Sequence, residues 1–85
     1  MVEVGKCYLI RGVTMASVGR VTAIGDKFIA LEEGSWVADT GRFSECLKNG
    51  TFAEVEVVPD GVIYVSIGAI MDIFNWNHAL PKVTK

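Results

Sequence analysis

Residues 62–76, VIYVSIGAIMDIFNW, decide the fold that the sequence predicts. Through residues 62–67 the side chains alternate between two faces that are both largely apolar, which is the pattern of a strand covered on both sides. Gly68 interrupts this pattern, and a glycine inside a strand marks a bulge, a bend or a close backbone approach. The apolar run restarts at Ala69 and continues to Phe74. We therefore predict two short strands hinged at Gly68, as in small β-barrels where a strand passes from one sheet to the next.

β-forming residues and alternation predict four more strands, at residues 5–14, 18–24, 28–31 and 53–57. Very short links join the first three, which indicates a meander. Residues 35–38 offer an extension of the third strand. The run Pro59-Asp60-Gly61 predicts a turn, because proline presets φ and glycine accepts a positive φ.

A short helix is predicted between the third strand and residues 53–57. Asp39-Thr40 offers an N-cap, and three apolar residues follow at i, i+3 and i+4. Lys48 lies where a cation suits the helix dipole, and Asn49-Gly50 supplies the stop. The helix insertion therefore covers about residues 39–50.

Together these five or six short strands predict a mostly β fold, which we take as a small and strongly bent five-stranded antiparallel barrel of SH3-like or Sm-like type with one short inserted helix. We expect one domain over residues 1–76 and a C-terminal tail, residues 77–85, that frays. An OB-like strand order stays open, because an OB fold places its helix between the third and fourth strands, where this helix lies.

Composition points to a partner. The chain has 85 residues, of which 51% are hydrophobic, more than a short barrel hides easily. The simplest partner that could bury this excess apolar surface is another copy of the chain. A net charge of −2 argues against non-specific nucleic-acid binding. No apolar run approaches the roughly 18 residues of a membrane span and no leader pattern is evident, so we expect a cytoplasmic protein without membrane contact.

Little in the sequence suggests catalysis. Cys7 and Cys46 have no metal or redox spacing, and we expect both to be reduced thiols. The one histidine, His78, lies in the tail, where we expect an exposed side chain. The glycines are scattered at turns and form no phosphate loop. We predict no enzymatic activity, no metal and no cofactor.

Two segments resemble the motifs of the Sm-like family, which includes LSm proteins and bacterial Hfq. Residues 18–33, VGRVTAIGDKFIALEE, are similar to the first motif, with Gly19 early in the strand, Asp26 near the turn and an acidic end. Residues 65–73, VSIGAIMDI, are similar to the second, whose core reads His-Ala-Ile in Hfq. The resemblance covers most of residues 5–74, apart from residues 34–61, where the family varies in length.

The resemblance implies a homo-oligomeric ring of about five to seven subunits, in which the fourth strand of one copy pairs with the fifth strand of the next. A monomer or dimer stays open as the alternative. It also implies RNA or nucleotide binding at a pore-facing turn, with Lys27, Phe28, Ser66 and Gly68 nearest. The family's pocket uses an asparagine and a basic residue or histidine that this chain lacks, so its usual uridine recognition is not implied.

The alternative function is a protein-interaction or structural adaptor module, a ring or a dimer, that binds no nucleic acid. Its contact surface would comprise Trp36, Arg42, Phe43 and Lys48 around the inserted helix. The simpler structural interpretations are that Phe28 belongs to the core and that Trp36 packs the helix onto the barrel. A small-ligand site at a subunit boundary is a third hypothesis, and a small acidic β-protein also suits a phage or mobile-element gene.

Overall fold

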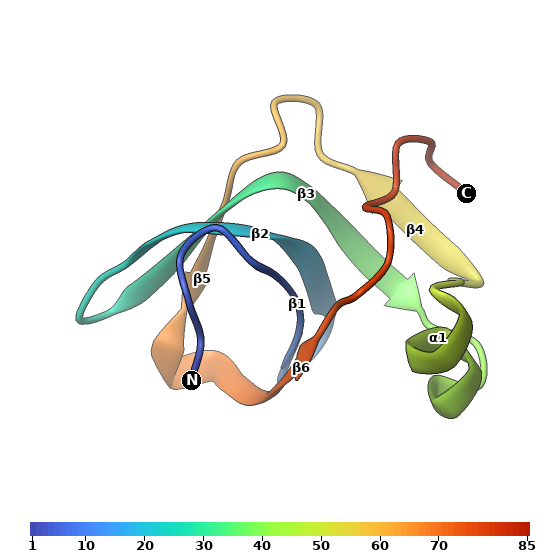
Figure 1. Ribbon diagram of the computed structural model, residues 1–85, viewed down its shortest axis with the longest axis horizontal. Coiled ribbons are helices and arrows are strands. Elements are labelled where there is room, and N and C mark those ends of the chain that lie inside the picture. Colours follow the sequence, from blue (N-terminus) through green and yellow to red (C-terminus); the bar gives the residue numbers. More distant parts are fainter.

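A computed structural model describes residues 1–85. It confirms a mostly β chain with a single α-helix (Figure 1). The elements are β1 (Cys7–Gly12), β2 (Ala16–Ile24), β3 (Phe28–Asp39), α1 (Phe43–Asn49), β4 (Glu54–Val57), β5 (Ile63–Ser66), the 3₁₀ turn η1 (Ile67–Ala69) and β6 (Ile70–Asn75).

All strand pairs are antiparallel, and the order is β4-β3-β2-β1-β6 with β5 paired to β3. The prediction of five strands is wrong, because this is a sheet of six strands. The predicted closed barrel is not confirmed either, because no ladder joins β5 to β6 and the sheet stays open there. Figure 1 shows β1, β2, β3, β5 and β6 curled around one another, with α1, β4 and the C-terminal segment together on the other side.

β3 includes the extension that residues 35–38 offered, and it serves two partners. Its first half pairs with β5 and its second half with β4. Between the halves, Glu33 has a φ of 49° and the amide of Gly34 donates to the carbonyl oxygen of Gly61 at 2.8 Å. A Cβ on Gly34 would lie 2.7 Å from Ile63 Cδ1, so only glycine fits this close approach. The acidic end expected after Leu31 is therefore a bend within one strand.

Two hydrophobic cores lie on opposite faces of β1. Tyr8 and Ile10 belong to the core inside the curl, whereas Leu9 belongs to the core beneath α1, β4 and the tail. The residues of the inner core are Tyr8, Ile10, Val21, Ile29 and Leu31. Those of the second core are Leu9, Ala16, Val18, Val37, Cys46, Phe52, Val55, Trp76 and Leu80. Covering both faces explains why the strands are apolar on both sides.

The predicted hinge at residue 68 is confirmed as the turn η1 between β5 and β6. The amide of Ile70 donates to the carbonyl oxygen of Ile67 and closes the turn. A Cβ on Gly68 would meet nothing within 4 Å, and Gly68 is not among the glycines with positive φ. The bend therefore does not require a glycine at this position.

The helix start was predicted wrongly and its end correctly. Asp39 does not cap α1, because its carboxylate accepts the amide of Gly41 at 2.8 Å in a local turn. The helix begins later, at Phe43, behind Arg42, which gives no side-chain cap. Gly50 ends it in the left-handed conformation with a φ of 72°, and its amide donates to the carbonyl oxygen of Cys46.

Residues 77–85 do not fray, contrary to expectation. Lys85 and Val55 exchange two backbone hydrogen bonds, of 2.8 and 3.0 Å, along the outer edge of β4. Trp76 Nε1–H donates to the carbonyl oxygen of Ala79 at 3.2 Å, and Leu80 is buried in the second core. The tail is therefore part of the fold and covers an edge that would otherwise be exposed.

Candidate functional site

The structure brings together the four residues of the predicted nucleic-acid contact. Phe28, at the start of β3, lies opposite Ser66, at the end of β5. The amide of Ile67 donates to the carbonyl oxygen of Lys27 at 2.8 Å, which ties the β2–β3 turn to η1 and Gly68. We call Lys27, Phe28, Tyr64 and Ser66 the β3–β5 corner.

The interpretation of Phe28 as a core residue is wrong, because 51% of it is exposed. Ile29 and Leu31 point into the inner core, and the alternation of β3 turns Phe28 to solvent. Tyr64 shares this outer face, because it pairs with Ala30 two positions along β3, and it is 70% exposed. Sequence reasoning missed Tyr64, although the alternation of β5 would have placed it on the same face as Ser66.

The charge of the corner comes from one cation. Lys27 is exposed and takes part in none of the five ion pairs of the chain. The acidic neighbour Asp26 lies in the same turn. Two exposed aromatic rings beside one lysine favour stacking over attraction of many phosphates.

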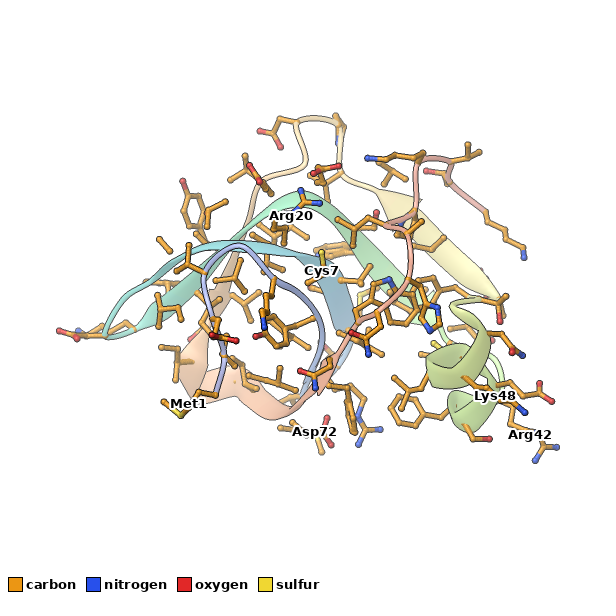
Figure 2. The ribbon with its side chains drawn as sticks, in the orientation of Figure 1. Met1, Cys7, Arg20, Arg42, Lys48 and Asp72 are labelled. Atoms are coloured by element: carbon orange, nitrogen blue, oxygen red, sulfur yellow. The ribbon has the colours of Figure 1, made fainter.

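The predicted protein-contact residues do not form one surface. Phe43 is half-buried, with its ring 5.1 Å from the ring of Phe74 in an edge-to-face pair. Figure 2 shows Arg42 and Lys48 at the outer side of α1. Trp36 is 50% exposed, whereas its neighbour Val37 points into the core beneath α1. Trp36 therefore lies on the other face of β3, and the prediction that it packs the helix onto the barrel is wrong.

Trp36 instead borders a groove on that face. Its cross-strand partner is Glu56 of β4, and the cavity beside them measures about 260 Å³. Val57, Val58 and Pro59 line the remaining wall. We call these five residues the Trp36 groove.

The largest cavity, of about 500 Å³, lies between the N-terminal segment and the end of β6. The carboxylate of Glu3 and the ammonium of Lys6 both line it and lie 2.9 Å apart. Their hydrogen bond lowers the pKa of Glu3 and raises the pKa of Lys6. Each of these two charged groups therefore has the other as its partner. Cys7 also lines this cavity.

Other chemistry-bearing groups have structural partners. The expected exposed His78 is half-buried, and its Nε2–H donates to the carbonyl oxygen of Leu47 at 2.7 Å. Arg20 pairs with Glu32 and Glu33, and Glu33 also pairs with Lys82 of the tail. Both cysteines are unpaired, and burial raises the pKa of the Cys46 thiol.

Two strand edges stay unpaired, those of β5 and β6. The segment that carries them exposes Tyr64, Ile67 and Met71, whose exposed fractions are 70%, 36% and 66%. Its single charged residue, Asp72, accepts two hydrogen bonds from Arg11, of 2.7 and 2.5 Å. An apolar pair of open edges is a surface for further strand pairing.

Comparison with protein-family models, with curated proteins and with solved structures found no match to this chain. None of its helices has the length and apolar character that a membrane crossing requires. The chain also has no group of three histidine, cysteine or acidic residues placed to hold a metal ion.

Proposed function

We propose that this chain is a non-catalytic, Sm-like module that assembles into a homo-oligomeric ring and binds single-stranded RNA or a nucleotide at the β3–β5 corner. The strand order supports the Sm-like part of the proposal. The last strand pairs with the first, and the penultimate strand pairs with the third. An SH3-like or Sm-like barrel has this order, whereas an OB fold pairs its last strand with the third.

The open edges of β5 and β6 support assembly. In a ring, β5 of one copy would pair with β6 of the next, which completes the backbone hydrogen bonds at both edges. A heterologous contact of this kind closes into a ring when its rotation permits. The apolar side chains of this segment would be covered at the same time.

The exposure of Phe28 beside Lys27 carries the binding part of the proposal. A base can stack on an aromatic ring without specific hydrogen bonds, so this contact does not need the pocket asparagine that the chain lacks. Tyr64 offers a second ring on the same face. The arrangement predicts binding with little preference among bases.

The test is fluorescence anisotropy with labelled oligo-U and oligo-A at low salt. Stacking on one ring contributes about 1–3 kcal/mol per base, so Phe28→Ala should weaken binding by about 5- to 150-fold. Trp36→Ala, at the other end of β3, is the matched control and should bind as the wild type does. Absence of binding by the wild type, or equal binding by Phe28→Ala, would overturn this part of the proposal.

A further inference from the structure

The Trp36 groove is a second candidate contact surface, distinct from the β3–β5 corner. Trp36 lies in the half of β3 that pairs with β4, whereas Phe28 lies in the half that pairs with β5. Trp36 is half-exposed, whereas only 3% of Trp76, the other tryptophan of the chain, is exposed. An exposed tryptophan that borders a hollow is an unusual use of a large apolar side chain.

The groove is acidic and has no cation of its own. Glu56, which is exposed beside Trp36, takes part in none of the five ion pairs. A neighbouring hollow shares Val57, Val58 and Pro59 and is also lined by Asp60, whose carboxylate accepts the amide of Val62 at 3.0 Å. Lys82 also borders that hollow, but its ammonium lies 2.5 Å from the carboxylate of Glu33. The groove therefore presents free negative charge next to an aromatic face.

The groove has room for one side chain but is smaller than typical small-molecule sites. Its volume of about 260 Å³ lies below the roughly 300–1,000 Å³ of small-molecule sites. Val57, Val58 and Pro59 form an apolar wall for a methylene chain. Glu56 and the face of Trp36 attract a cation at the end of that chain.

We propose that the Trp36 groove binds a lysine or arginine side chain from an extended peptide segment of a protein partner. We choose a cationic side chain as the occupant because its charge is complementary to the negative charge of the groove. The same carboxylates repel the phosphates of RNA, so the two surfaces of the molecule take different partners. The proposal is independent of ring formation and of binding at the β3–β5 corner.

The test uses two pools of fluorescent dodecapeptides that differ at one central position, fixed as lysine or arginine in the first pool and as methionine or glutamate in the second. Anisotropy should show tighter binding of the cationic pool by the wild-type protein. Trp36→Ala should weaken this binding by about 3- to 30-fold, as expected for loss of a cation–π contact. Glu56→Gln should weaken it by about 2- to 5-fold and reduce its salt dependence.

Phe28→Ala is the control and should bind the peptides normally. Because Glu56 is exposed, Glu56→Gln keeps the test valid even if Trp36→Ala folds poorly. Equal binding of the two pools, or unchanged binding by both groove variants, would overturn the proposal. It would also be overturned if Trp36→Ala abolished oligonucleotide binding or reduced the mass of the assembly, because the occupant would then be RNA or a second copy.

Discussion

The contact between the end of α1 and the tail yields the sharpest prediction on stability, through the substitution Gly50→Ala. Gly50 ends the helix with a φ of 72°, where a residue with a Cβ is strained by about 1–2 kcal/mol. That Cβ would lie 2.5 Å from Cγ and 2.7 Å from Cβ of His78, which is too close without movement of the tail. Overpacking of this kind costs about 1–3 kcal/mol. The substitution should therefore destabilise the fold by about 2–5 kcal/mol.

Urea denaturation followed by circular dichroism measures this effect. For a chain of this size, with an m value of about 1 kcal/mol/M, the midpoint should fall by about 2–5 M. The decisive comparison is a double-mutant cycle with His78→Gly, because removal of both the imidazole and the Cβ of residue 78 leaves only the backbone strain. The two substitutions should show a favourable coupling of about 1–3 kcal/mol.

Gly68→Ala is the matched control, since its Cβ would meet nothing within 4 Å and its φ is not positive. It should leave stability unchanged or raise it by about 0.4–1 kcal/mol. If Gly50→Ala costs the same with and without His78, the tail does not pack against the helix end. Our description of residues 77–85 would then be refuted.

Two further predictions concern titration and thiol reactivity. Hydrogen bonds from Arg11 lower the pKa of Asp72, so this pair stabilises the fold at neutral pH and its contribution is lost as the pH falls through the lowered pKa, below about pH 4. Asp72→Asn should flatten the acid side of the melting-temperature profile, and an identical profile would contradict the assignment. Burial raises the pKa of Cys46, whereas Cys7 reaches a cavity, so a thiol reagent at about pH 8 should label one cysteine in the native protein and two after unfolding. Mass spectrometry counts the labels, and two labels on native protein would exclude the buried position of Cys46.

Local patterns predicted most of the elements because the relevant forces act between near neighbours. Alternation marked the strands, and the i, i+3, i+4 spacing of Phe43, Cys46 and Leu47 marked the helix face that packs into the second core. Gly50 acts as the stop because its positive φ is a local requirement. The interruption of the apolar run at Gly68 correctly predicted the bend between β5 and β6.

The remaining features depend on surfaces that only the fold creates. Residues 77–85 have a loop-like composition, and they are ordered by the edge of β4 and by the helix end that contacts His78. The pair Glu33-Gly34 has the signature of a strand end, but pairing to Gly61 holds it within one long strand. Neither partner could be identified from neighbours in the sequence.

The candidate site was predictable in part. Placing Lys27 and Phe28 near residues 66–68 followed from the resemblance to the Sm-like motifs, and the strand register brings them together. The exposure of Phe28 would have followed from the alternation with Ile29. The separation of Trp36 from Phe43 depends on which face of β3 the helix covers, and short-range patterns do not contain that information.

The absolute mass of the purified protein, measured by light scattering on a size-exclusion column at two salt concentrations, tests the central claim most directly. Pairing of the open β5 and β6 edges predicts one discrete species of about five to seven subunits. The contact between these edges would be largely apolar, and its one charged residue, Asp72, is already paired with Arg11 within the subunit. The mass should therefore be the same at both salt concentrations. A monomer at both salt concentrations would contradict the account, because the β5 and β6 edges would then remain unpaired in solution.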